Sequence, residues 1–436
     1  MQQLSGLNVD LRQMVIAIET AVSLVGMNDT NHGKRVGYIA SKIAHQLGFS
    51  NSDTQFAFEL GLLHDCGVST EQMHSELVNH FDWDGAYIHC NIGYQLLNTF
   101  QPLSKFSVPI LHHHTPWSDL IKLDINNYDA MMANLIFLSD RIDVLSAEHY
   151  GKGILLAKEQ VVASVTNQSE TYFSPELVNA FQKIQHSEAF WIALEDRHIT
   201  RYIWDMGRLT SNQPLTLDQI KHLSLIMSYI VDQKSTFTAQ HSVRVADVAK
   251  YLASEYGLDK EQCEKVEIAG LLHDLGKLHT PDYILEKTGP LNKIERSIMD
   301  QHSYETFEIL RHIEGLGEVA SWAAFHHEGV NGSGYPFHPS ESDLPIEARI
   351  IAVADVFQAL SQDRPYRKGM QVKDILKILN EDANAGKLDK EIVGLVNCCA
   401  EACFEVAKGT DPNNNQAYLN LFAKSCFQGA IMDVTL

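Results

Sequence analysis

Paired cysteines, long apolar runs and an excess of positive charge are all missing from this sequence. No two of its seven cysteines form a CxxC pair, which disfavours a disulfide framework and an oxidising compartment; they stand at positions 66, 90, 263, 398, 399, 403 and 426. The apolar stretch MVIAIETAVSLVGM is short and contains Glu19, so it does not read as a membrane span or a targeting segment. We therefore expect a soluble cytoplasmic protein without a membrane partner.

The charge balance excludes one broad class of partner. The chain has 34 Lys and Arg against 55 Asp and Glu, a net charge of −21, which argues against a protein that binds nucleic acid polymers by neutralising phosphates. An anionic ligand would need a local positive source, and a bound metal ion can supply one. The helical spacing of Cys398, Cys399 and Cys403 indicates buried small side chains in preference to a zinc site.

A repeat relates the two halves of the chain. HGKRVGYIASKIAHQLGF from His32 aligns with HSVRVADVAKYLASEYGL from His241, and GLLHDCG aligns with GLLHDLG at the same offset of 209 residues. With small insertions the register continues through His89 and His302, His113-His114 and His326-His327, and Asp140 and Asp355. We therefore predict two homologous domains, residues 1–205 and 206–436.

Both halves have helical periodicity. Apolar residues in VRVADVAKYLASEY recur every three or four positions, and DKEQCEKVEIAGLLHD has an acidic first turn followed by an apolar stripe. No long segment alternates between apolar and polar residues as a half-buried strand would. The pattern predicts an all-α fold made of two similar helical bundles.

The second half gathers nitrogen and oxygen donors that suit metal ions. Such side chains facing a bundle interior are how helical proteins build dimetal sites, and the set is large enough for two metals. A single histidine at a helix end is more often a cap or a surface residue, but seven residues in a repeated order favour a site. The predicted ligands are His241, His273, Asp274, His302, His326, His327 and Asp355.

The segment HDLGK suggests how the chemistry could be arranged. At a helix end Asp274 could bridge two ions while His273 binds one, so that a shared water loses a proton near neutral pH. Lys277 could then contact a phosphoryl oxygen, although a lysine near a helix C-terminus is also favoured by the dipole alone. We expect Gly276 to let the backbone leave the helix.

The stretch HHEGVNGSGYP at 326–336, with HSVRV, HDLGK and RPYR, resembles the HD-GYP domain, a branch of the HD phosphohydrolases that cleaves cyclic dinucleotides. Every fixed position of HHExxxGxGYP is met, and the resemblance covers about residues 230–400. It implies metal ligation by the seven residues above and phosphate contact by Lys277. It also implies a substrate pocket shaped by Gly334, Tyr335 and Pro336, with Arg364 and Lys368 as phosphate or base contacts.

Three departures from the family pattern concern the second half. Phe237 stands where some members carry a glutamate for a third metal, so we expect two divalent ions, iron or manganese. Asn331 replaces a common aspartate, and Thr306 replaces a common glycine. The last two affect the expected fit of the substrate without removing a ligand.

A weaker, HD-like version of the motif covers the first half. Its ligand-type residues are His32, His64, Asp65, His89, His113, His114 and Asp140. Val68 replaces the lysine, and the GYP loop is absent, so we expect a regulatory or structural role there, with metal binding left open. This half would pack against the active half or against another copy in a homodimer. The pairing of a degenerate and an intact HD domain resembles bacterial phosphodiesterases that act on 3′3′-cGAMP.

These features favour a phosphodiesterase that uses a dimetal-bridged hydroxide to open a cyclic dinucleotide, 3′3′-cGAMP or c-di-GMP, into a linear product. Two alternatives stay open. One is a cyclic dinucleotide receptor that does not hydrolyse its ligand. The other is an HD phosphohydrolase that acts on mononucleotides.

Overall fold

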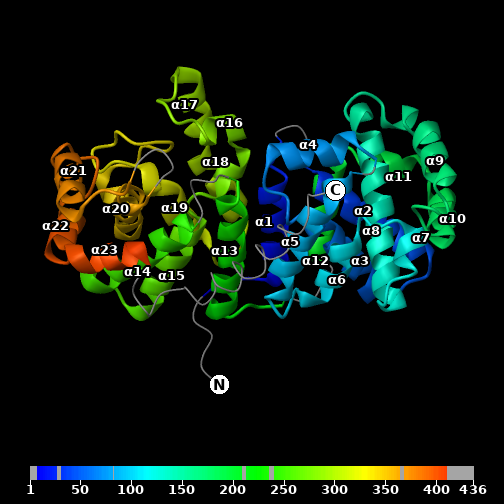
Figure 1. The fold of residues 1–436 in the computed structure, drawn as a ribbon, viewed down its shortest axis with the longest axis horizontal. Helices are drawn as coiled ribbons and strands as arrows, with labels where there is room; N and C mark the ends of the chain where they lie inside the picture. Colours follow the sequence, from blue (N-terminus) through cyan, green and yellow to red (C-terminus); the bar gives the residue numbers. More distant parts are fainter. Residues whose placement is uncertain are drawn as a thin grey trace, which may run out of the picture. The chain divides into compact units, whose positions relative to one another are not determined.

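The computed structural model describes residues 7–26, 31–81, 83–208, 213–234, 240–363 and 368–409. These residues form two compact units (Figure 1). The first unit is made of residues 18–208, and the second unit is made of residues 7–17 and 213–409. Within the described ranges, helices make up the regular structure and two isolated bridges are the sole extended pairing. The predicted all-α fold is confirmed.

Helix α1 (Leu11–Val22) begins in the second unit and ends in the first. The other helices of the first unit are α2 (His32–Gln46), α3 (Asn51–Leu63), α4 (Glu71–Asn79), η1 (Asp84–Ala86), α5 (Tyr87–Asn98), η2 (Ser104–Phe106), α6 (Ser107–His112), α7 (Trp117–Leu120), α8 (Asn127–Ser146), η3 (Ala147–His149), η4 (Ile154–Leu156), α9 (Lys158–Asn167), α10 (Pro175–Ile184), α11 (Glu188–Ile192) and α12 (Asp196–Arg208).

The second unit repeats this helical plan. Its helices are α13 (Leu217–Asp232), α14 (His241–Tyr256), α15 (Lys260–Leu272), η5 (Leu275–His279), α16 (Asp282–Leu285), α17 (Lys293–Met299), α18 (His302–Leu310), α19 (Gly317–Ala324), η6 (Phe325–His327), η7 (Glu341–Asp343), α20 (Ile346–Ser361), α21 (Val372–Asn384), α22 (Lys390–Cys398) and α23 (Ala400–Lys408).

The start of the chain is tied to the second unit by backbone hydrogen bonds. The amide of Leu215 donates to the carbonyl of Val9 at 2.9 Å, and the amide of Leu11 donates to the carbonyl of Gln213 at 3.0 Å. The division into a regulatory and a catalytic domain between residues 205 and 206 stays a prediction.

Local sequence explains the helices that carry the site. Helix α15 begins after Asp259, whose carboxylate accepts the amide of Gln262 while the Gln262 side chain accepts the amide of Asp259, a capping box. Helix α14 packs on α13 and α15 through Leu225, Val243 and Leu271, which are at most 3% exposed. Burial of these apolar side chains fixes the helix ends that present the ligand-type residues.

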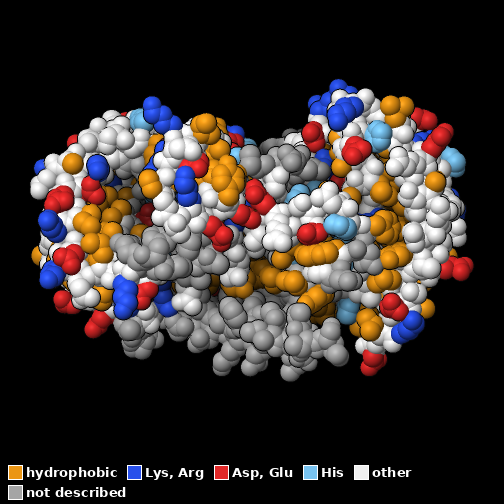
Figure 2. Space-filling view, turned by 45° about the horizontal axis from the view of Figure 1, so that its top comes forward, with side chains coloured by type: hydrophobic (Ala, Val, Ile, Leu, Met, Phe, Trp, Pro, Cys, Tyr) orange, Lys and Arg blue, Asp and Glu red, His pale blue; other side chains and the backbone are white. Residues whose placement is uncertain are grey.

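On the face drawn in Figure 2, acidic and basic side chains are interspersed over the described parts of both units. No described helix is long and apolar enough to cross a membrane.

The sequence predicts buried cysteines at the end of the second unit. Cys403 is buried as expected. The expectation is wrong for Cys398, which is exposed because it is the last residue of α22, where the chain turns toward α23.

Candidate metal centre

The seven predicted ligands of the second unit converge from separate elements. Two of them are the first residues of their helices, and the others follow or lie within helices: His241 opens α14, His273 caps the C-terminus of α15, Asp274 follows it, His302 opens α18, His326 and His327 lie in η6, and Asp355 lies in α20. Helix ends and a 3₁₀ turn therefore position most of the donor atoms.

The carboxylate of Asp274 lies between two sets of imidazoles. Its Oδ2 atom is 3.6 Å from Nε2 of His241 and 3.3 Å from Nε2 of His273. Its Oδ1 atom is 3.6 Å from Nε2 of His302 and 3.7 Å from Nε2 of His326. One carboxylate thus presents a different oxygen to each side, the arrangement that a bridging ligand requires.

Two groups of three donors flank this carboxylate. His241, His273 and Asp355 form one group, and His302, His326 and His327 form the other; within each group the donor atoms lie within 4.8 Å of one another. Oδ1 of Asp355 also lies 3.2 Å from Nε2 of His241. Each group could hold one metal ion, with Asp274 shared between them.

Hydrogen bonds set the imidazoles in one tautomer. Nδ1 of His273, His302 and His326 each lies 2.7 Å from a backbone carbonyl oxygen of the preceding turn. Nδ1 of His241 lies 2.5 Å from Oε1 of Gln358. Since these oxygens only accept hydrogen bonds, Nδ1 carries the proton and the Nε2 lone pair faces the carboxylates, the orientation of a metal ligand.

The buried polar atoms fit a bound cation. Nε2 of His273 and Oδ1 of Asp274 are buried without a hydrogen-bond partner, although buried polar atoms normally have one. Burial and the charges of His327 and Lys277 lower the pKa of His302 to about 3, which keeps its imidazole neutral. Facing lone pairs of this kind require a positive charge between them.

Lys277 and Gly276 lie beside the bridging carboxylate. Nζ of Lys277 is 2.5 Å from Oδ2 of Asp274, and the lysine side chain is 20% exposed. The expected role of Gly276 is wrong, because α15 already ends before His273 and no positive φ is needed. Glycine is needed for close approach: a Cβ at Gly276 would lie 2.0 Å from the carbonyl oxygen of His302.

The GYP loop folds against one of the ligands. The amide of Tyr335 donates to the carbonyl of His327 at 3.3 Å, and the two rings have centroids 4.9 Å apart. A Cβ at Gly334 would lie 2.2 Å from that same carbonyl oxygen, so this approach also requires glycine. Pro336 follows Tyr335, and the buried carboxylate of Glu328 accepts the amide of Phe337 at 2.6 Å. The loop is therefore anchored beside His327, one of the predicted ligands.

Two predicted substrate contacts, Arg364 and Lys368, stay predictions. Arg364 lies outside the described residues, as does Phe237, on which the expected absence of a third metal rests. Lys368 is exposed. The roles given to these residues stay predictions.

Three residues have supporting contacts that were not predicted from the sequence. The hydroxyl of Thr306 donates to the carbonyl of His273 at 3.0 Å and accepts the amide of Gly276 at 2.9 Å. Gln358 accepts a hydrogen bond from His241 and so orients its ring. It lies one turn after Asp355 on α20, so helical spacing could have indicated that it faces the site. Glu328 stood in the HHE motif, but its contact with the loop could not be read from spacing.

The first unit repeats the central geometry without the same surroundings. Oδ2 of Asp65 is 3.3 Å from Nε2 of His64 and 3.7 Å from Nε2 of His32, and Oδ1 is 3.5 Å from Nε2 of His89. His113 lies beside His89, with their Nε2 atoms 3.2 Å apart. The two remaining ligand-type residues also meet, because Nε2 of His114 is 3.9 Å from Oδ2 of Asp140. Val68, which is 1% exposed, lies where the second unit has the half-buried Lys277.

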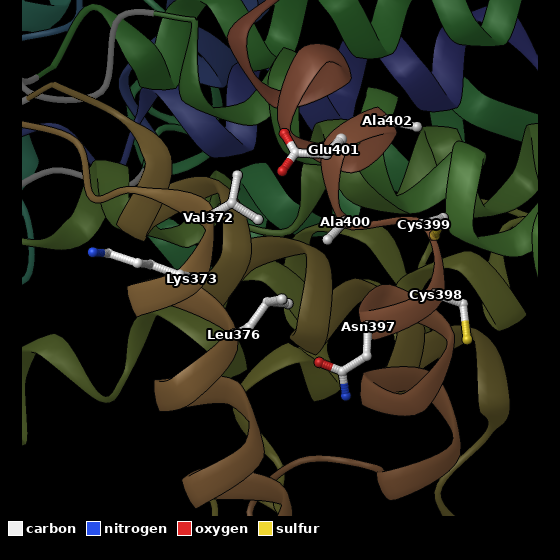
Figure 3. Close-up of a pocket in the computed structure, with 9 residues that line it drawn as sticks. All are labelled: Val372, Lys373, Leu376, Asn397, Cys398, Cys399, Ala400, Glu401 and Ala402. Carbon is white, nitrogen blue, oxygen red and sulfur yellow. The ribbon is translucent and has the colours of Figure 1, made fainter.

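A separate pocket lies away from the predicted ligands. Figure 3 shows it between α21, α22 and α23, and its volume is about 580 Å³. Its lining includes Lys373, Cys398 and Glu401 but none of the predicted ligands. The pocket therefore adds nothing to the metal centre.

Comparison with known proteins agrees with the repeat. Residues 225–392 and residues 30–148 both match the HD domain. The 3′3′-cGAMP-specific phosphodiesterase 1 of Vibrio cholerae serotype O1 is 36% identical over 414 residues, which cover 93% of this chain and 95% of that protein. A cyclic di-GMP phosphodiesterase of Pseudomonas aeruginosa is 32% identical over 37% of this chain and 40% of its own.

A solved structure supports the fold. The crystal structure of V-cGAP3, a cyclic GMP-AMP-specific phosphodiesterase of Vibrio cholerae, matches with a TM-score of 0.62 and 21% identity, over 93% of this chain and 99% of that chain. The expectation of two HD domains in tandem is confirmed. The chain belongs to the family of HD-domain phosphodiesterases that includes the 3′3′-cGAMP-specific phosphodiesterase 1 of Vibrio cholerae.

Proposed function

We propose that this protein is a metal-dependent phosphodiesterase that hydrolyses a cyclic dinucleotide to a linear dinucleotide. The observation that carries the proposal is the carboxylate of Asp274, which faces a donor group on each side beside the anchored GYP loop. The relative named for 3′3′-cGAMP aligns along almost the whole chain, whereas the Pseudomonas aeruginosa relative named for cyclic di-GMP aligns over 37% of it. This difference favours 3′3′-cGAMP over c-di-GMP as the substrate.

The donor set suits two divalent ions, and we propose iron or manganese. Imidazole nitrogens with carboxylate oxygens, and no thiolate, are typical of such sites. His241, His273 and Asp355 would hold one ion, His302, His326 and His327 would hold the other, and Asp274 would contact both. When bound, the ions would acidify water and neutralise charge on the phosphate.

The side chains prepare the site for an anionic substrate. Burial and the charge of Lys277 lower the pKa of His327 to about 4, so the ring stays neutral and available as a ligand at pH 7. Lys277 is partly exposed at the edge of the centre, where its ammonium can attract a phosphoryl oxygen during attack. Tyr335 offers an aromatic face to a base. In the reaction a water oxygen bonds to phosphorus, one phosphorus–oxygen bond of the ring breaks, and the departing oxygen takes a proton.

The test is product analysis with the full chain. The protein, reconstituted with Mn²⁺ or with Fe²⁺ under anaerobic conditions, is incubated with 3′3′-cGAMP, c-di-GMP and dGTP, and products are separated and weighed by mass spectrometry. We expect a linear dinucleotide heavier than its substrate by one water, with faster turnover of 3′3′-cGAMP. Binding without a product would indicate a receptor, and hydrolysis of dGTP alone would indicate a mononucleotide phosphohydrolase; either result overturns the proposal.

A further inference from the structure

The first unit contains a second set of ligand-type side chains that the proposed reaction does not use. We propose that this set holds metal ions of its own in a non-catalytic centre, and that the thiol of Cys90 is one of the ligands. The inference does not depend on the proposed function, because it rests on the residues of the first unit alone.

The donor geometry of the first unit matches that of a metal centre. His32, His64 and Asp140 form one group, and His89, Cys90 and His113 form another, with donor atoms within 4.8 Å in each group. The carboxylate of Asp65 reaches both groups, with one oxygen near His64 and the other near His89. Nε2 of His64, which lies 3.3 Å from that carboxylate, is buried without a hydrogen-bond partner. An unpartnered buried nitrogen beside a carboxylate fits a cation.

The histidine tautomers are set as in the second unit. Nδ1 of His64 lies 2.8 Å from the carbonyl oxygen of Gly61, and Nδ1 of His113 lies 2.6 Å from the carbonyl oxygen of Ile110. Nδ1 therefore carries the proton in both rings, and Nε2 is left as the ligand atom.

Cys90 changes the chemistry of the group it joins. Its Sγ atom is 3.7 Å from Nε2 of His89, the nitrogen that faces Asp65, and the residue is 1% exposed. The equivalent position of the second unit is Ser303, whose hydroxyl lies 3.4 Å from Nε2 of His302. A thiol that loses its proton on binding favours softer ions such as Zn²⁺, whereas a hydroxyl does not.

The residue behind the first histidine also differs between the halves. Nδ1 of His32 lies 2.7 Å from Oδ2 of Asp143, while His241 has the amide of Gln358 in this place. Asp143 is itself fixed by Arg35, whose Nε donates to Oδ1 at 2.7 Å. A carboxylate behind an imidazole makes the ring a stronger ligand, which favours retention of the metal.

The cavity beside the first centre is small. It has a volume of about 30 Å³ and is lined by Glu19, His32 and Val68 among others. That volume suffices for one or two waters. Glu19 is 3% exposed, and its Oε1 atom has no hydrogen-bond partner. Its Oε2 atom lies 3.2 Å from Nζ of Lys34. The equivalent residue of the second unit, 209 positions later, is the smaller Ser228. This cavity is therefore too small to admit a dinucleotide.

Metal analysis of paired variants of the full chain tests the site. Asp65→Ala and Asp274→Ala remove the shared carboxylate from the first and the second centre, and their double variant removes both. We expect each single variant to keep about half of the wild-type metal and the double variant to keep almost none. An Asp274→Ala protein without metal, or a folded Asp65→Ala protein with the full wild-type content, would overturn the proposal. Wild-type turnover is measured separately, so failure of the proposed function would leave this result intact.

The thiol ligand is tested by spectroscopy in the Asp274→Ala background loaded with Co²⁺. We expect the near-ultraviolet charge-transfer absorption of a thiolate–Co²⁺ bond, and we expect its loss in Cys90→Ser. Serine is the residue of the equivalent position 303, so this variant keeps the test valid even where Asp65→Ala fails to fold. Cys66→Ser, which removes another buried thiol of the same unit, should leave the absorption unchanged. Absence of the band before substitution, or its persistence in Cys90→Ser, refutes ligation by Cys90.

Discussion

Replacing Gly276 by alanine tests whether close packing behind the metal centre sets its geometry. The added Cβ would lie 2.0 Å from the carbonyl oxygen of His302 and 2.8 Å from the backbone nitrogen of Thr306. Backbone atoms cannot rotate away as a flexible side chain could, so η5 and the first turn of α18 must separate. His302 opens α18, and Asp274 directly precedes η5, which means that the separation acts on the two sides of the second donor group.

The size of the effect follows from the overlap. Real Cβ contacts do not fall below 3.0 Å, so a contact of 2.0 Å demands a displacement of about 1 Å. Overpacking of this kind costs about 1–3 kcal/mol of unfolding free energy. A misplacement of about 1 Å at a reacting centre costs on the order of 100-fold in rate. We therefore expect Gly276→Ala to fold, with reduced metal content and turnover lowered about 100-fold.

The assay compares three glycines. Urea unfolding, metal analysis and turnover are measured for Gly276→Ala, for Gly67→Ala and for Gly394→Ala. Gly67 is the equivalent residue of the first unit, where a Cβ would lie 2.1 Å from the carbonyl of His89, so stability should fall similarly while turnover is largely kept. Gly394 has open space around a Cβ and serves as the neutral control. Wild-type metal content and turnover in Gly276→Ala would refute the reasoning.

Three further predictions concern the second centre. Asp274→Asn should abolish turnover and lower metal content, because an amide cannot present two anionic oxygens; an active variant with full metal would contradict the shared-ligand role. Lys277→Met should keep its metal and lose about 100-fold or more in kcat, and unchanged kinetics would limit the lysine to pairing with Asp274. His302 and His327 have pKa values lowered from 6.5 to about 3 and about 4, chiefly by burial, so the folded state binds fewer protons than the unfolded state. Stability of the metal-free protein should therefore fall as pH drops from about 6.5 toward 4, and His327→Gln should weaken this slope in urea unfolding; an equal slope would contradict the assignment.

Much of the site could be predicted because the repeat exposed it. The order of histidines and aspartates recurs in both halves, and helical spacing around Asp355 places it on the face of α20 that also carries Gln358. The hydrogen bonds of Thr306 join residues that are far apart in the sequence, so no local sequence pattern could predict them. The role of Gly276 was wrong for the same reason, because its neighbour is the carbonyl of His302 on another helix. The exposure of Cys398 could not be predicted either, because it depends on the residue at which α22 ends.

The two halves share the proposed metal-holding interior and differ at the proposed catalytic rim. Both have a carboxylate between imidazoles. In both, a backbone carbonyl accepts a hydrogen bond from Nδ1 of a histidine, His64 or His273. Both also need a glycine, Gly67 or Gly276, where a backbone carbonyl approaches closely. They differ at the rim, where the second unit has Lys277 and an anchored GYP loop, whereas the first has Val68 and the buried Glu19 over a cavity of about 30 Å³. The first unit lacks the lysine and the loop of this rim but keeps the interior donors. A duplicated HD unit can therefore lose its reaction while its interior donors keep the geometry of a metal site.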